Sequence, residues 1–193
     1  MEMKTREMRT FDITGLQKRD GLNDQPAMIS GYASVFNSKT SIGDFFDEVI
    51  APGAFSKSLA NNSDVRALFN HNWDKVLGRT KSGTLRLFED DRGLKFEIDL
   101  PDTSVARDLA ESMARGDINQ CSFGFFATSE NWDYTSEPAL RTVTEVELYE
   151  ISIVSIPAYE DTEAALVRSK EIDKEVEQRL KILNQIKGVL ENE

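Results

Sequence analysis

The chain has 193 residues, of which 39% are hydrophobic and 30% charged, enough apolar material for one folded domain with an appendage. Its 34 acidic and 23 basic residues give a net charge of −11, which disfavours binding to nucleic acid or to an anionic membrane. No apolar run is long enough to cross a bilayer and the first residues are too polar for a secretory signal, so we expect a soluble cytosolic protein. A single cysteine excludes an internal disulfide, and a single histidine disfavours a zinc site.

The first half of the chain is predicted to be rich in strands after a polar arm. Residues 1–26 are polar and mixed in charge, so we expect a frayed arm or an edge strand there. Strand-forming side chains fill residues 27–37, and a short helical turn is expected over 54–60, after a Pro-Gly break. Apolar and polar side chains alternate over residues 65–73, which predicts one strand with His71 on its more apolar face.

The middle of the chain predicts a hairpin followed by a helix. Residues 84–88 and 94–100 are two strand-like runs, and the loop between them ends in glycine, which is typical of a hairpin. Apolar side chains recur every four residues over 103–115, which indicates a helix. Asp102 or Thr103 can cap its start, and the glycine that follows favours its end.

Two longer strands and a second helix are expected in the rest of the chain. The strands cover residues 118–127 and 141–156, and a proline ends the second one. Residues 171–190 carry apolar side chains at spacings of three and four, as an amphipathic helix does. The fold class is therefore mainly β with flanking helices (α+β) and a C-terminal amphipathic helix. The corresponding arm, body and helical tail are residues 1–26, 27–168 and 169–193.

One carboxylate departs from the alternation expected over residues 141–156. Counted by twos, Glu150 falls on the same face as Val146 and Leu148. A carboxylate on an apolar face loses hydration, so it must take up a proton or find a hydrogen-bond donor. The alternative is that Glu150 lies at the rim of a barrel, in water or paired with an arginine.

His71 and Ser122 add the two other residue types that a serine protease needs. A serine hydroxyl is a weak nucleophile and requires an imidazole to take its proton, and the imidazole requires an acceptor on its other nitrogen. A desolvated Glu150 suits that third role. A histidine on an apolar face is more often structural, however, and periodicity does not show that these strands are neighbours. From the residues alone the triad is a hypothesis.

Several ordered segments carry a resemblance to a known family. They include GYASVFN at 31–37, LFNHNWDKVLGRT at 68–80, RGDINQCSFGF at 115–125 and LYEISIVSIPAY at 148–159. The sequence resembles the prohead maturation proteases of tailed bacteriophages, serine proteases that are related in fold to the herpesvirus assemblins. The resemblance covers about residues 27–160 and implies that the body, residues 27–168, is a compact β-barrel-like protease domain.

The resemblance also implies a catalytic set and a setting. The histidine of the LFNH segment is His71, the nucleophile of the SFGF segment is Ser122, and the third member is Glu150, with Glu147 as the alternative. The implied substrates are the scaffolding region of the major capsid protein or a separate scaffold protein, and the protease itself. It would act inside the assembling procapsid in the bacterial cytoplasm, with no cofactor or metal and with homodimerisation left open. A non-catalytic assembly protein that keeps the protease fold, and a β-barrel binding module with a structural histidine, are the competing readings.

Overall fold

The computed structural model describes most of the body, over residues 6–19, 27–43, 45–61 and 63–155. The helix expected over 171–190 and the tail expected over 169–193 lie outside the described residues.

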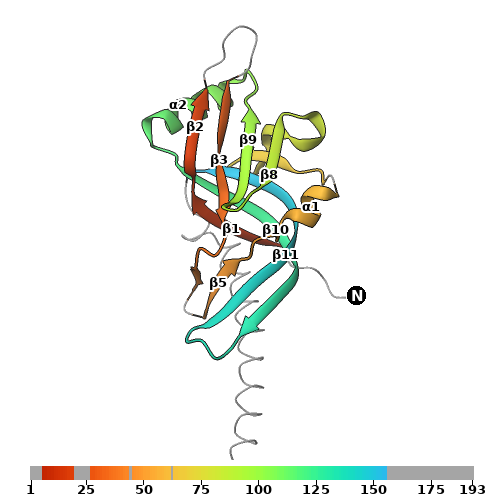
Figure 1. Ribbon diagram of the computed structural model, residues 1–193. Helices are drawn as coiled ribbons and strands as arrows, with labels where there is room; N and C mark the ends of the chain where they lie inside the picture. Colours follow the sequence, from red (N-terminus) through yellow and green to blue (C-terminus); the bar gives the residue numbers. More distant parts are fainter. Residues whose placement is uncertain (1–5, 20–26, 44, 62, 156–193) are drawn as a thin grey trace, which may run out of the picture.

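The described chain is built mainly of strands, with two short α-helices and one 3-10 turn (Figure 1). The strands are β1 (Glu7–Asp12), β2 (Thr14–Arg19), β3 (Met28–Val35), β4 (Thr40–Ile42), β5 (Phe46–Ile50), β6 (Arg66–Phe69), β7 (Asn72–Arg79), β8 (Leu85–Glu89), β9 (Gly93–Asp99), β10 (Gln120–Asp133) and β11 (Ala139–Val154). The helical segments are α1 (Ser56–Ala60), η1 (Thr80–Ser82) and α2 (Ser104–Arg115).

These strands form two sheets and, over the described residues, no closed barrel. Sheet A has seven strands: β1, β10, β11, β5 and β4 follow one another, while β6 pairs with both β11 and β7. Sheet B has four strands in the order β2, β3, β9 and β8. The expected mainly β class is confirmed, but the expected compact β-barrel is not closed over the described residues. The reason is that β1 and β4 end the main path of sheet A without pairing to each other.

Most of the elements expected from the sequence are confirmed. Residues 27–37 contain β3, the hairpin over 84–100 is β8 and β9, and the helix over 103–115 is α2. The Thr103 hydroxyl accepts a hydrogen bond from the Ala106 amide at 3.3 Å, as an N-cap does. The arm provides two edge strands, β1 in sheet A and β2 in sheet B.

The single strand expected over residues 65–73 is wrong. The chain reverses at Asn70 and His71, so β6 and β7 form an antiparallel hairpin in which Phe69 pairs with Asn72. His71 therefore lies in a turn and not on the apolar face of a strand. The short strands β4 and β5 were also not expected, because β5 is defined by parallel pairing with β11, about ninety residues later in the chain.

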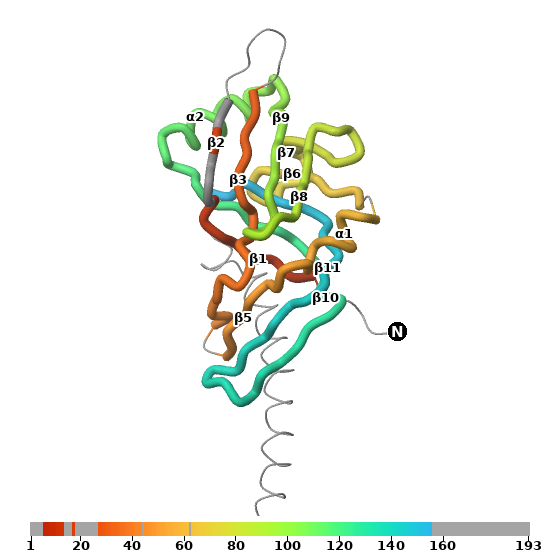
Figure 2. The backbone as a smooth tube through the Cα atoms, viewed as in Figure 1, coloured from red at the N-terminus to blue at the C-terminus, as the bar shows by residue number. Residues whose placement is uncertain are grey.

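The long hairpin of β10 and β11 occupies the middle of sheet A. The turn end of this hairpin extends beyond sheet B (Figure 2). One face of the hairpin carries an aromatic cluster centred on Phe123, whose ring centroid lies 5.9 Å from Phe11, 5.4 Å from Phe55 and 5.2 Å from Phe125. These rings belong to a buried apolar core that sheet B and α2 also join. The cluster packs β1 and the start of α1 against β10, the strand that carries Ser122.

Strand β1 is also held by a buried ionic network. Arg9 donates to both oxygens of Glu48 at 2.5 and 2.7 Å, and Arg141 donates to Glu48 at 2.8 Å and to Glu7 at 2.6 and 2.9 Å. Glu130 accepts from Arg141 as well. Burial alone would raise the pKa of Glu7, but the hydrogen bond from Arg141 and the charges of both arginines lower it. The network ties β1, β5, β10 and β11 into one sheet.

A β-bulge determines which face of β11 carries Glu150. Gly124 pairs with Glu150 but Phe125 pairs with Leu148, so Tyr149 is an extra residue on β11. Paired residues share a face, so Leu148 lies on the core side with Phe125 and Glu150 lies on the opposite side with Gly124. The expected grouping of Glu150 with Leu148 is therefore wrong, because alternation is interrupted between the two residues.

Candidate active site

His71 reaches the site from a strained two-residue turn. Asn70 and His71 have φ angles of 53° and 55°, and two successive positive angles are the mark of a type I′ hairpin turn. Asparagine tolerates this region well, whereas a histidine there costs on the order of 1 kcal/mol. A strained backbone that persists is often found at functional sites, where surrounding contacts hold it in place.

Asn70 supplies those contacts. Its amide N–H donates to the carbonyl of Ile153 at 2.9 Å, and its side-chain oxygen accepts from the Ser155 amide at 2.9 Å. Its side-chain amide also donates to the Ser155 hydroxyl at 3.1 Å. The turn that carries His71 is thus fixed to the end of β11, the strand that carries Glu150.

His71 and Glu150 form a direct hydrogen bond. The Nδ1 of His71 lies 2.8 Å from Oε1 of Glu150, and Glu150 is only 1% exposed. When Glu150 is ionised its carboxylate only accepts, and in that state Nδ1 carries the proton and Nε2 of a neutral ring is left as an acceptor. The second oxygen of Glu150 accepts from the Ser152 hydroxyl at 2.5 Å. Both carboxylate oxygens therefore have a donor.

Ser122 lies on the same face of sheet A, one strand away from Glu150. It pairs with Ser152 of β11 on one side and with Thr10 of β1 on the other. Because Glu150 and Ser152 are two residues apart beyond the bulge, their side chains point to the face that Ser122 occupies. The structure therefore brings His71, Ser122 and Glu150 to one region of one face, although His71 comes from a turn and not from a strand as expected.

Two atoms at this site are buried and lack a hydrogen bond among the described residues: Nε2 of His71 and Oγ of Ser122. They are the acceptor and the donor that a serine nucleophile and its base would bring together. No hydrogen bond joins them in this structure. Catalytic hydrogen bonds are often long in unliganded enzymes and shorten when substrate binds.

Comparison with known proteins places the chain in a family. A family model described as the caudovirus prohead serine protease matches residues 14–178. The chain is also 37% identical over 165 residues to the prohead protease of Enterobacteria phage HK97, covering 83% of this chain and 68% of that relative. The chain belongs to the prohead serine protease family.

Two further matches agree with this family. The prohead protease of Escherichia phage T5 is 26% identical over 144 residues, which cover 73% of this chain and 63% of that relative. The solved structure of the bacteriophage T4 capsid assembly protease matches with a TM-score of 0.57 and 12% identity, over 81% of this chain and all of that one. At this identity the match shows a shared fold. The relation to the herpesvirus assemblins stays an expectation.

The other candidate side chains of this prohead protease family member are placed less favourably. Glu147, the alternative third member, is exposed on β11. Cys121 is the neighbour of Ser122, but burial raises the pKa of its thiol far above neutral and the nearby charge of Glu150 adds to the effect. The Cys121 thiol is therefore protonated and is a poor nucleophile at neutral pH.

Two residues that support the site were not found by sequence reasoning. Ser152 follows Glu150 at a spacing of two, which would have placed it on the same strand face. Asn70 directly precedes His71, and asparagine at such a position favours a turn. Asn70 did not stand out because residues 65–73 alternate as in a strand. Ser152 did not stand out because a serine at such a position is common.

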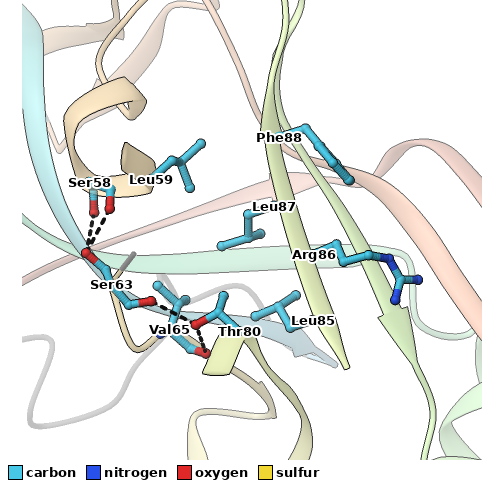
Figure 3. Close-up of a pocket in the computed structure, with 9 residues that line it drawn as sticks. All are labelled: Ser58, Leu59, Ser63, Val65, Thr80, Leu85, Arg86, Leu87 and Phe88. Atoms are coloured by element: carbon cyan, nitrogen blue, oxygen red, sulfur yellow. Dashed lines mark hydrogen bonds between the residues drawn. The ribbon is translucent and has the colours of Figure 1, made fainter. Parts of the chain in front are cut away.

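A separate pocket of about 270 Å³ lies between α1 and β8 (Figure 3). Its lining mixes apolar and polar side chains, and the hydroxyls of Ser63 and Thr80 donate to the carbonyls of Ser58 and Ser63 at 2.8 Å each. The residues that line it include none of the His71, Ser122 and Glu150 set.

Within the described residues no three His, Cys, Asp or Glu side chains are grouped as metal ligands would be. None of the described helices combines the length and hydropathy needed to cross a membrane.

Proposed function

We propose that this family member is a serine endopeptidase of capsid maturation that uses Ser122 as nucleophile, His71 as general base and Glu150 as the acceptor that orients His71. The hydrogen bond between His71 and the buried Glu150, on the face of sheet A that carries Ser122, is the observation that supports this most directly. The name of the family and the names of its members support the same reaction class.

In the proposed mechanism the Ser122 hydroxyl attacks a peptide carbonyl while Nε2 of His71 takes its proton. The His71 imidazolium then lies 2.8 Å from Glu150, whose negative charge stabilises it. His71 next gives the proton to the leaving amine, and an acyl-enzyme on Ser122 remains. A water molecule hydrolyses this ester with His71 again acting as base.

The proposed substrates follow from the relatives. One relative is named a capsid assembly protease and two are named prohead proteases. By analogy the substrates of this chain are the scaffolding region of the major capsid protein or a scaffold protein, together with the chain itself. The reaction would take place inside the procapsid, in the cytoplasm of the bacterial host. Homodimerisation stays open.

The decisive experiment is co-expression with the capsid protein of the same phage, followed by mass spectrometry of the products. We expect Ser122→Ala to abolish cleavage of the capsid protein and of the chain itself. Ser34→Ala is a matched control, because Ser34 is also 0% exposed on a strand and its hydroxyl also lacks a hydrogen bond among the described residues. Cleavage that persists in Ser122→Ala would favour the competing reading of a non-catalytic assembly protein, with the cutting done by another enzyme.

A further inference from the structure

Ser152 makes the second hydrogen bond to the carboxylate of the proposed triad. Its hydroxyl donates to Oε2 of Glu150 at 2.5 Å, while Oε1 faces Nδ1 of His71 at 2.8 Å. Ser152 is 0% exposed, so no bulk water reaches this bond in the structure. Building on the proposed function, we propose that Ser152 is a positioning residue that keeps Glu150 ionised and directed at His71.

Burying a carboxylate is costly unless its oxygens accept hydrogen bonds. Glu150 is 1% exposed, so an oxygen that loses its hydrogen-bond partner is not solvated by bulk water instead. His71 satisfies one oxygen only. Without Ser152 the second oxygen has no donor among the hydrogen bonds of the described residues, and proton uptake by the pair becomes more favourable.

Ser152 also fixes the direction of the carboxylate plane. Two partners on different oxygens, one from the β6–β7 turn and one from β11 itself, leave Glu150 little freedom to rotate. A carboxyl group that took up a proton would donate to His71 Nδ1 and move the ring proton to Nε2. That tautomer cannot accept the proton of Ser122.

Ser152 is not placed to be the nucleophile itself. Its proton is directed at a carboxylate, which is a much weaker base than the imidazole, whereas the hydroxyl of Ser122 makes no competing hydrogen bond. Ser122 and Ser152 are paired across β10 and β11. In this interpretation Ser122 reacts with the substrate, and Ser152 supports Glu150.

The test is the pH dependence of fluorophosphonate labelling of the purified full chain. The activated serine displaces fluoride from the probe while the base takes its proton, so the rate reports the unprotonated pair, neutral His71 with ionised Glu150, without a peptide substrate. In Ser152→Ala we expect labelling at neutral pH to be about 10- to 100-fold slower. Loss of the hydrogen bond disfavours the unprotonated pair most, so the acid limb of the profile is expected to move to higher pH.

Three further variants make the result specific. Ser152→Thr keeps the hydroxyl donor and is expected to keep the pH profile, while Ser152→Cys keeps the size with only a weak donor and is expected to shift the profile as alanine does. Ser58→Ala is the control, since Ser58 is buried and accepts from the Leu148 amide of the same strand at 2.9 Å. It is expected to lower the melting temperature and leave the pH profile unchanged.

The outcomes separate this inference from the proposed function. An unchanged acid limb in both Ser152→Ala and Ser152→Cys would overturn the positioning role while Ser122 remained the nucleophile. Labelling that survives in Ser122→Ala but vanishes in Ser152→Ala would instead make Ser152 the nucleophile and overturn both proposals. Labelling of neither wild type nor any variant, in chains that are folded and that fail to process capsid protein, would refute the proposed function itself.

Discussion

Replacing Glu150 by glutamine tests the third role in the proposed triad most directly. The side chains have nearly the same shape, but the amide carries one donor group and one acceptor in place of two acceptors. In the structure one oxygen accepts from His71 and the other from Ser152. A glutamine can satisfy only one of these donors, and an NH₂ group facing Nδ1 would impose the unreactive tautomer on His71.

The size of the effect follows from the charge that develops on His71. Glu150 is 1% exposed and the His71 side chain 25%, so an intermediate effective dielectric constant of about 20 is appropriate. Two unit charges with centres about 4 Å apart then interact by about 4 kcal/mol. This corresponds to roughly a 10³-fold change in rate, within a range of about 10²–10⁴ for loss of the third member of a triad.

The assay is the rate of capsid-protein cleavage, with fluorophosphonate labelling of the purified chain as a second measure. Glu147→Gln is the matched control, since Glu147 lies on the same strand but is exposed. We expect Glu147→Gln to stay within a few-fold of the wild type. Full activity in Glu150→Gln together with a large loss in Glu147→Gln would refute the assignment and move the third role to Glu147.

Three other predictions concern the elements that hold the site. In Gly124→Ala the new Cβ would lie 2.5 Å from Cζ of Tyr149, so we expect a loss of about 1–3 kcal/mol of stability, measured by urea denaturation, and slower labelling, because the ring of Tyr149, the bulged residue next to Glu150, must move. Asn70→Ala is expected to slow labelling and to lower the free energy of unfolding by about 1–2 kcal/mol. Asn70→Gly should recover part of this free energy, because glycine accepts the positive φ angle, but it cannot restore the hydrogen bonds to the end of β11. Glu7→Gln is expected to lower the free energy of unfolding by about 1–3 kcal/mol at pH 7, since it removes one partner of the buried Arg141. The pKa of Glu7 is lowered from 4.5, so this contribution is present above that value and lost as the pH falls through the folded-state pKa; a difference between variant and wild type that persists unchanged at pH 3 would contradict the ionic role.

Local patterns were sufficient for the regular elements. The helix α2 could be predicted with its Thr103 cap and its final glycine, because a cap, a four-residue spacing and a left-handed end all depend on neighbours in sequence. The hairpin of β8 and β9 is equally local. Strand β5 could not be predicted in this way, because its partner in the sheet is the first part of β11 and its Glu48 is buried only through arginines from β1 and β11.

The candidate site was predicted in composition but not in geometry. Regular alternation over 141–156 predicts Glu150 on an apolar face with Leu148, whereas in the structure the two residues lie on opposite faces. Burial was nevertheless the right criterion, since Glu150 is surrounded by protein on its own face and needs the donors that His71 and Ser152 provide. His71 was assigned to a strand face, whereas it reaches Glu150 from a turn.

Both departures from regular alternation are needed to bring the site together. If the chain continued as one strand through His71, that strand would extend beyond the end of β6 by about 3.3 Å per residue. His71 would then lie farther from Glu150, which β6 pairs with through its first residue. If β11 alternated regularly from Leu148 through Tyr149 to Glu150, with no bulge, Glu150 would point into the aromatic core with Leu148 and not toward Ser122. Alternation therefore fails to predict the structure at two places, the turn at His71 and the bulge at Tyr149. These are the places that bring the candidate catalytic residues onto one face of sheet A.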